Sequence, residues 1–210
     1  SSIRVGAIYT IGPYLFPKLV TEMQRVAPQM PLYIEENFTE TLRHKLRKGE
    51  LDAIIIALPF HEPDVLTRPL YDETFSVITP KDHPLVKQGQ VETSQLNELN
   101  MLLLGEGHCF RDQVLESCPS LNQSFHDQHR VTEGSSLETI RMMVASGLGT
   151  SVLPRSAIEG HPTEGMVEVL PFKAPEPQRT VALGWRASFP RPQAIDVLVN
   201  AITKCHGSSK

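Results

Sequence analysis

The sequence has little cysteine, few aromatic residues and no long apolar run. It contains three cysteines, and aromatic side chains make up 6% of its 210 residues. A small, odd number of cysteines argues against a secreted disulfide framework and favours a cytoplasmic location, where disulfides are transient, catalytic or sensing. The longest apolar run, residues 53–58, is far too short to span a membrane. We therefore expect no membrane association.

The chain also lacks a positive net charge and a secretory start. Its formal net charge is −4 at pH 7, so the overall charge does not favour binding to nucleic acid or to anionic lipid. No basic segment followed by an apolar one opens the chain. The start Ser-Ser-Ile-Arg, without methionine, suggests a fragment of a longer protein or the remnant of a tag. A content of 40% hydrophobic and 21% charged residues is ordinary for a globular protein.

Hydrophobic patterning in the first quarter of the chain indicates an α/β unit. Strands are expected at residues 3–9, 32–36 and 51–58. Helices are expected between them, from Tyr14 to about Ala27 and from Glu40 to Lys48, with Thr39 at the N-cap position of the second. This alternation predicts parallel strands with right-handed crossovers.

A second α/β unit follows. The expected strands are residues 75–79, 101–104, 129–133, 150–153 and 166–170. Ser135 and Glu138 form a capping box before a helix with a periodic apolar face. A strand at 179–185 and a helix at 192–204 close the chain.

The order of these segments predicts two Rossmann-like lobes joined by two crossover strands, near residues 72–80 and 175–182. Lobe I would comprise residues 1–74 and 180–210, and lobe II residues 75–179. Ligands are expected in the cleft between such lobes, at the carboxyl ends of the strands.

The stretch from Gly105 to Cys118 carries the most chemistry, because it holds two cysteines nine positions apart. If the residues after Gly107 are helical, nine steps rise about 13 Å and place Cys118 on the face opposite Cys109. A disulfide needs Cα atoms within roughly 7 Å. Joining the two thiols would therefore require the helix to unwind, which is the geometry of a redox switch.

Cys109 is well placed to react. It follows His108 at an expected helix N-terminus, where the helix dipole favours a thiolate, and Arg111 is near enough in sequence to add positive charge. Peroxide would oxidise the thiolate to a sulfenic acid, which a second thiol condenses to a disulfide. Cys118 is the candidate partner, because Pro119 ends any helix beside it.

Interpretations of the cysteines without redox chemistry remain open. Both can be small buried hydrophobes. A zinc site formed by Cys109, Cys118, His126 and His129 is a weaker alternative, since the two cysteines lack the short Cys-x₂₋₄-Cys spacing of such sites. Cys205, in the final turn of the last helix, has no polar cluster around it and is expected to be incidental.

Several hydroxyls could surround the mouth of the predicted cleft. Thr10 and Thr39 fall at strand-to-helix turns of the first unit, and Ser135 and Ser136 cap a helix of the second. Each can equally be a simple helix cap. Asp112 could hold His108 in place, or it could be a first-turn partner of the helix dipole.

These residues resemble a known family. The segment Gly107-His-Cys-Phe-Arg-Asp-Gln113 with Cys118, the helix at residues 136–145, and the segments 9–17 and 175–180 are similar to the regulatory domain of the OxyR family, hydrogen peroxide sensors among the LysR-type transcriptional regulators. The resemblance covers essentially the whole chain. It implies the type II periplasmic-binding-protein-like fold of LysR effector domains.

The resemblance also implies roles for individual residues. Cys109 matches the peroxidatic cysteine and Cys118 the resolving one. Positions that surround peroxide or assist proton transfer match Thr10, Thr39, His108 and Asp112, and we add Arg111 and Ser135 to this set. No metal or cofactor is implied.

The function implied is regulation rather than catalysis. Disulfide formation would change a homodimer or homotetramer and thereby DNA binding and transcription activation by the full-length protein. Promoter DNA and RNA polymerase would bind only through that protein, because the winged helix-turn-helix is absent here, and a glutaredoxin- or thioredoxin-type reductant would reset the switch. Two alternatives are a small-molecule effector domain with structural cysteines and a thiol peroxidase.

Overall fold

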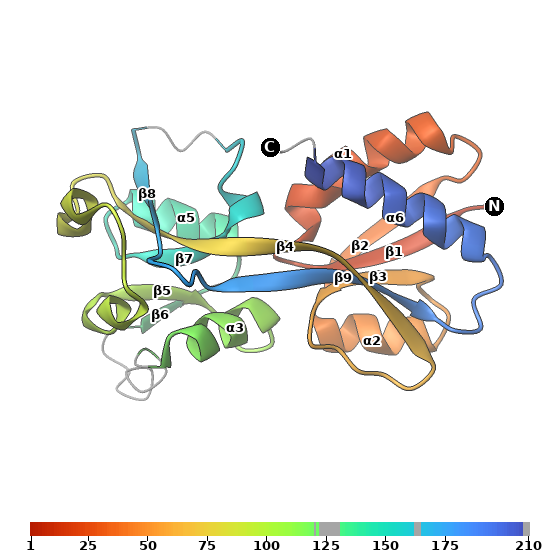
Figure 1. Cartoon of the computed structure of the whole chain (residues 1–210), viewed down its shortest axis with the longest axis horizontal. Coiled ribbons are helices and arrows are strands. Elements are labelled where there is room, and N and C mark those ends of the chain that lie inside the picture. The colour runs from red at the N-terminus through yellow and green to blue at the C-terminus, as the bar shows by residue number, and fades with distance from the viewer. Residues whose placement is uncertain (120, 122–130, 162–164, 208–210) are drawn as a thin grey trace. The chain divides into compact units, whose positions relative to one another are not determined.

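The chain folds into two compact units, and Figure 1 shows its elements. The first unit is Ser1–Asp72 with Arg179–Lys210, and the second is Glu73–Gln178. The computed structural model describes residues 1–119, 121, 131–161 and 165–207. Within these ranges no helix has the length and apolar character needed to cross a membrane.

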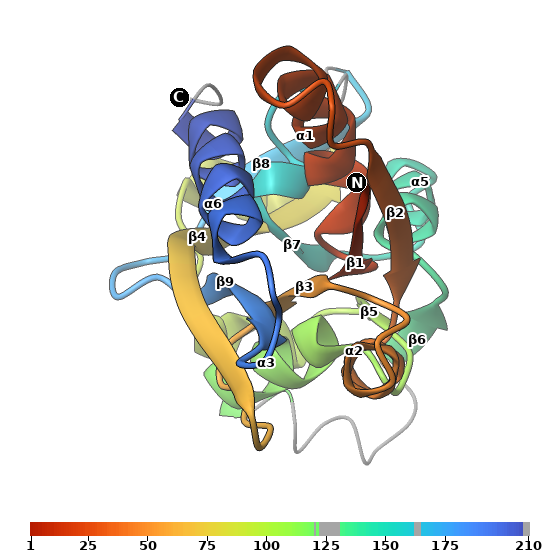
Figure 2. The same ribbon diagram turned by 90° about the vertical axis from the view of Figure 1, so that its right-hand side faces the viewer.

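The first unit is a sheet with the strand order β2-β1-β3-β9. Strand β1 runs parallel to β2 and β3, and β3 pairs with β9 in antiparallel fashion. Figures 1 and 2 show α1 and α6 on one face of this sheet and α2 on the other. The elements are β1 (Ile3–Ile8), α1 (Gly12–Val26), β2 (Leu32–Asn37), α2 (Thr39–Arg47), β3 (Ala53–Ala57), β9 (Gln178–Arg186) and α6 (Pro192–Gly207).

Burial explains why these residues form a two-sided sheet. Every residue of β3 is buried, as expected for a strand covered on both faces. A Cβ on Gly6 would lie 2.5 Å from Leu42 Cδ2 and 2.7 Å from Leu51 Cδ1, so a glycine lets α2 pack closely on β1. The strand–helix alternation and the parallel pairing predicted from the sequence are confirmed.

Two predicted helix starts in this unit are wrong, because α1 begins at Gly12 rather than Tyr14 and the N-cap of α2 lies one residue before Thr39. The N-cap of α2 is Phe38 rather than Thr39, because Phe38 has extended dihedrals and its carbonyl accepts the first helical bond, from Leu42 N at 3.0 Å. Thr39 is already helical, and α2 has no side-chain cap hydrogen bond.

The second unit contains two groups of paired strands. Strand β5 runs parallel to β6, and the part of β4 from Phe75 to Pro80 pairs antiparallel with β7 and β8. The elements are β4 (Val65–Pro80), which begins in the first unit, β5 (Met101–Leu104), α3 (Cys109–Ser117), β6 (Val131–Gly134), α5 (Leu137–Ala145), β7 (Ser151–Pro154) and β8 (Val167–Pro171), with 3-10 helices at Pro84–Gln88, Thr93–Glu98 and Arg155–Ala157.

A strand boundary and a helix cap of this unit differ from those predicted. The strand expected at residues 129–133 is β6, residues 131–134, and residues 129 and 130 lie outside the described part of the chain. The capping box of Ser135 with Glu138 is wrong, because Ser136 is the N-cap of α5. The Ser136 hydroxyl accepts from Thr139 N at 3.1 Å, and its carbonyl accepts from Ile140 N.

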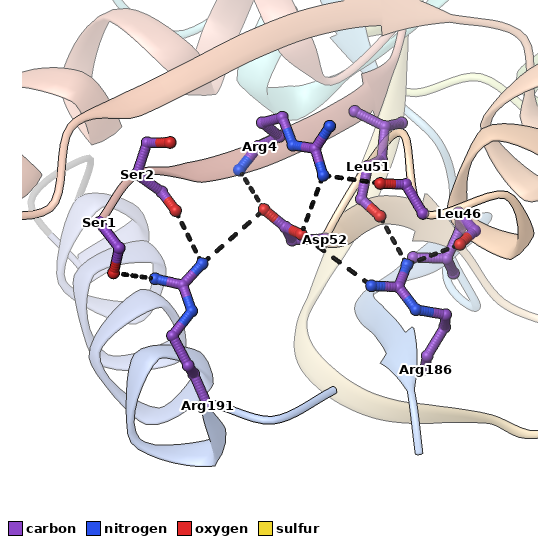
Figure 3. Close-up of polar contacts among 9 residues, drawn as sticks. Ser1, Ser2, Arg4, Leu46, Leu51, Asp52, Arg186 and Arg191 are labelled. Atoms are coloured by element: carbon purple, nitrogen blue, oxygen red, sulfur yellow. Dashed lines mark hydrogen bonds and ion pairs between the residues drawn. The ribbon is translucent and has the colours of Figure 1, made fainter. Parts of the chain in front are cut away.

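A buried carboxylate joins four segments of the first unit, as Figure 3 shows. Asp52, 7% exposed, accepts a hydrogen bond from the backbone N of Arg4 at 2.8 Å. The guanidinium nitrogens of Arg4, Arg186 and Arg191 lie 3.5, 4.0 and 4.0 Å from its oxygens. Asp52 therefore balances three cations from β1, the end of β9 and the start of α6.

The same arginines also bind backbone carbonyls. Arg186 Nη1 donates to Leu46 O and Leu51 O, at 2.6 and 2.7 Å, which satisfies carbonyls at and beyond the end of α2. Arg191 Nη2 donates to Ser2 O at 2.7 Å. Loss of the carboxylate would leave these cations close together without their shared counter-charge.

We therefore expect Asp52→Asn to lower the free energy of unfolding by about 1–3 kcal/mol, since it weakens charged hydrogen bonds at a buried site. Urea unfolding at neutral pH measures this change. Glu92→Gln is the matched control: it removes a carboxylate from an exposed pair with Lys173 at 3.3 Å and should change stability by less than about 0.5 kcal/mol. Equal effects of the two substitutions would contradict the role given to Asp52.

Candidate functional site

Helix α3 has a cysteine at each end. Cys109 is its first residue, after the N-cap His108, and Cys118 is its C-cap, with its N–H donating to Val114 O at 3.0 Å. The helix expected after Gly107 is thus confirmed. Nine helical steps rise about 13 Å, well beyond the reach of a disulfide. The three cysteines, all in the described part of the chain, form no disulfide.

The two thiols have different surroundings. Cys109 is partly exposed, whereas Cys118 is 1% exposed, and burial raises the pKa of its thiol to about 11. Cys205 in α6 is also buried, and burial raises the pKa of its thiol too. At neutral pH both buried thiols are protonated. Cys109 is the cysteine that solvent-borne reagents can reach.

His108 is a neutral side chain beside Cys109. It is 9% exposed, and burial lowers the pKa of its imidazole. A neutral imidazole has one N–H donor and one acceptor nitrogen. Gly107 precedes it with a φ of 96°, a conformation that glycine adopts without strain, and this turn sets the start of α3.

Arg111 anchors α3 to the neighbouring strands. It is 4% exposed, and its Nη1 donates to Leu104 O at 2.8 Å and to Glu133 Oε1 at 2.9 Å. Residues two apart on a helix point to different sides, so Arg111 and Cys109 do not share a face. The guanidinium is paired with the Glu133 carboxylate, and these contacts hold α3 against the end of β5 and against β6.

The other predicted residues of this unit are on the surface. Asp112 is exposed in the first turn of α3, where a carboxylate complements the helix dipole. Ser135 is exposed and directly precedes Ser136, the N-cap of α5. Within the residues described, no three His, Cys, Asp or Glu side chains are grouped to hold a metal, and His126 and His129 of the zinc alternative lie outside those residues.

The first unit has two buried threonines at one edge of its sheet. Thr10 is 2% exposed and Thr39 is 8% exposed. They follow the ends of β1 and β2, where Ile8 pairs with Asn37 in register, so both lie at the carboxyl edge of parallel strands. That edge is where α/β sheets bind ligands.

Arg179 holds Thr10 in place, and the sequence did not predict this. Its Nη1 donates to Thr10 Oγ1 at 2.7 Å, and its Nη2 donates to Thr10 O at 3.1 Å. Arg179 is 2% exposed although it lies near the start of β9. The partner is 169 positions away in sequence, and only the tertiary fold brings the two together.

Comparison with known proteins places the chain in a family. The model of the LysR substrate binding domain matches residues 1–205. The DNA-binding transcriptional dual regulator OxyR of Escherichia coli K12 is 34% identical over 95% of this chain, and a hydrogen peroxide-inducible genes activator of Dickeya chrysanthemi is also 34% identical over 95%. The chain spans 65% of the length of each.

Solved structures agree in fold and in sequence. The reduced OxyR regulatory domain from Pseudomonas aeruginosa is 62% identical with a TM-score of 0.89, and the match covers 98% of this chain and 96% of that one. A reduced OxyR from N. meningitidis is 44% identical with a TM-score of 0.93, covering 98% and 95%. The predicted periplasmic-binding-protein-like fold class is confirmed. The chain belongs to the LysR substrate binding domain family and, within it, to the regulatory domains of OxyR proteins.

Proposed function

We propose that this chain is the hydrogen peroxide-sensing domain of a LysR-type transcription regulator, with Cys109 as the sensing thiol and Cys118 as its partner. The difference between the two ends of α3 carries the proposal. Cys109 is partly exposed at a helix N-terminus, whereas Cys118 is buried and protonated at the other end. The names of two relatives support hydrogen peroxide as the stimulus. One is a hydrogen peroxide-inducible genes activator. The other is a hydrogen peroxide-bound mutant OxyR from Corynebacterium glutamicum, which is 30% identical with a TM-score of 0.91.

The chemistry proceeds in two balanced steps. The Cys109 thiolate attacks one oxygen of hydrogen peroxide, the O–O bond breaks, and the departing hydroxide takes a proton and leaves as water. The sulfenic acid on Cys109 is then attacked by the Cys118 sulfur, an S–S bond forms, and a second water leaves. The sulfur atoms are oxidised and both peroxide oxygens are reduced.

The remaining site residues support these steps. His108, neutral and buried beside Cys109, can donate its N–H to the departing oxygen. The hydroxyls of Thr10, fixed by Arg179, and of Thr39 are further candidates for binding peroxide. Asp112 and Ser135 are exposed, so we give them a lesser part in orienting the helix starts.

The proposed structural response to oxidation follows from helix geometry. Because α3 holds its ends apart, a Cys109–Cys118 bond requires α3 to refold. We propose that this refolding changes the arrangement of subunits in a dimer or tetramer of the full-length cytoplasmic regulator. That change would alter its binding to promoter DNA and RNA polymerase. A thiol reductant of the glutaredoxin or thioredoxin class would restore the thiols.

Thiol accessibility should differ among the three cysteines. At pH 8 and with the fold intact, iodoacetamide should modify Cys109 at least about tenfold faster than Cys118 or Cys205, because both others are buried with raised pKa values. Mass spectrometry of the alkylated peptides measures this. Denaturation should equalise the rates. Equal rates in the folded protein would show that Cys118 is not shielded.

The order of oxidation can be tested by removing one thiol at a time. After stoichiometric hydrogen peroxide, the wild type should lose two thiols, Cys109→Ser should lose none, and Cys118→Ser should keep a sulfenic acid that dimedone labels. Cys205→Ser is the matched control and should behave as wild type. Loss of thiols in Cys109→Ser would disprove the assignment, and continuous peroxide consumption with a reductant would favour a thiol peroxidase.

The contribution of Thr10 should appear in the rate of oxidation. Thr10→Val should slow thiol loss under excess peroxide by about tenfold or more, since a positioned polar group is removed. Thr10→Ser keeps the hydroxyl that accepts from Arg179 and should restore most of the rate. Thr21→Val, at an exposed hydroxyl bonded to Pro17 O, is the control. An unchanged rate in Thr10→Val, with the fold intact, would leave Thr10 a structural role only.

A further inference from the structure

The guanidinium of Arg111 fastens α3 to the ends of two paired strands. Its Nη1 donates to Leu104 O at 2.8 Å and to Glu133 Oε1 at 2.9 Å. Leu104 is the last residue of β5. Glu133 lies on β6, which runs parallel to β5 with Leu103 opposite Glu133. One nitrogen atom of a helix side chain therefore bridges both strands of this two-stranded sheet.

Glu133 is the accessible member of this contact. The side chain of Arg111 is 4% exposed, whereas that of Glu133 is 52% exposed. A buried cation is costly unless an anion or hydrogen bonds compensate it, so the carboxylate stabilises Arg111 in its buried position. A Cβ built on Gly105 would lie 3.5 Å from Glu133 Oε2, so the second carboxylate oxygen lies beside the loop that leads into α3. A substitution at Glu133 therefore changes the charge of the pair without opening a cavity at the buried arginine.

Helix α3 is too short to be stable by itself. It has nine residues, whereas isolated helices below about 12–15 residues are marginal in water. Its N-cap, His108, makes no side-chain cap hydrogen bond. Besides the contacts of Arg111, the Phe110 ring packs edge-on against Phe75, with centroids 4.9 Å apart. The strength of the Arg111–Glu133 pair therefore contributes to how often α3 opens.

We propose that Glu133 is a positioning residue that sets the rate at which Cys118 reacts with oxidised Cys109. The inference rests on the proposed function. In that step the Cys118 sulfur attacks the sulfenic sulfur, the S–S bond forms, the S–O bond breaks, and the Cys118 proton leaves with the hydroxyl as water. The two sulfur atoms meet only when α3 opens, and Glu133, through Arg111, opposes that opening. The first step, attack of Cys109 on peroxide, needs no opening of the helix.

A different role for the pair would give a different pattern of rates. If the charge of Arg111 acted on the Cys109 thiolate, removal of the Glu133 carboxylate would strengthen that charge and speed the first step. The geometry favours the role in helix opening, because Arg111 is two positions from Cys109 on the helix and is directed to β5 and β6. The two steps can be measured separately.

Substitution of Glu133 tests the proposal. Glu133→Gln keeps the shape and an acceptor oxygen but removes the charge that strengthens the bond to Arg111. After stoichiometric hydrogen peroxide and rapid quenching, mass spectrometry should show the Cys109–Cys118 disulfide replacing the sulfenic acid about fivefold faster than in the wild type. In the Cys118→Ser background, the rate of sulfenic acid formation should be unchanged. Glu159→Gln removes an ion-paired carboxylate elsewhere in the same unit and, as the control, should match the wild type.

The outcomes separate a failure of this inference from a failure of peroxide sensing. Equal rates of disulfide formation in Glu133→Gln and the wild type, or a faster first step, would overturn the role of Glu133. In the reduced protein, without peroxide, the α3 amides of Glu133→Gln should exchange hydrogen about fivefold faster than those of the wild type. If they do so but the wild type forms no disulfide, the proposed function fails, and this inference with it. If their exchange is unchanged while the wild type forms the disulfide, only the role of Glu133 fails.

Discussion

The fixed rise of an α-helix is the constraint on which the account of this domain depends. Helix α3 begins at Cys109 and ends at Ser117, with Cys118 as its C-cap, so its backbone hydrogen bonds and the Cys109–Cys118 bond exclude one another. The asymmetry of the thiols follows from the same helix. Its start leaves Cys109 partly exposed, and its end buries Cys118, where desolvation keeps the thiol protonated.

The side chains that hold α3 in place determine what its refolding would cost. Arg111 bonds Leu104 O and Glu133, and the Phe110 ring contacts Phe75 edge-on with centroids 4.9 Å apart. Breaking a buried charged hydrogen bond costs about 1.5–3 kcal/mol. Closing the short loop between the cysteines constrains the refolded segment by about 2.5 kcal/mol in the chain-entropy picture. Both terms oppose formation of the disulfide, so the free energy of thiol oxidation by peroxide must offset them.

Much of the fold and the position of the thiols could be predicted from the sequence, because both depend on local patterns. Apolar periodicity gave the α/β order, and nine helical steps between Cys109 and Cys118 gave their separation. Errors arose at helix starts, where the backbone dihedrals of a single residue determine which position is the N-cap, as at Phe38 and Ser136. The contacts of Arg179 with Thr10 and of Asp52 with three arginines were not predictable, since each joins residues distant in sequence.

Hydrogen exchange of the α3 amides tests the central claim most directly. The Cys118 amide, bonded to Val114 O, and the other amides of the helix would be followed before and after stoichiometric hydrogen peroxide, with the Cys109–Cys118 peptide verified by mass spectrometry. We predict that protection of these amides is lost when the disulfide forms and returns on reduction, while the amides of β1 and β3 keep their protection. A disulfide that forms with α3 protection unchanged would contradict the account.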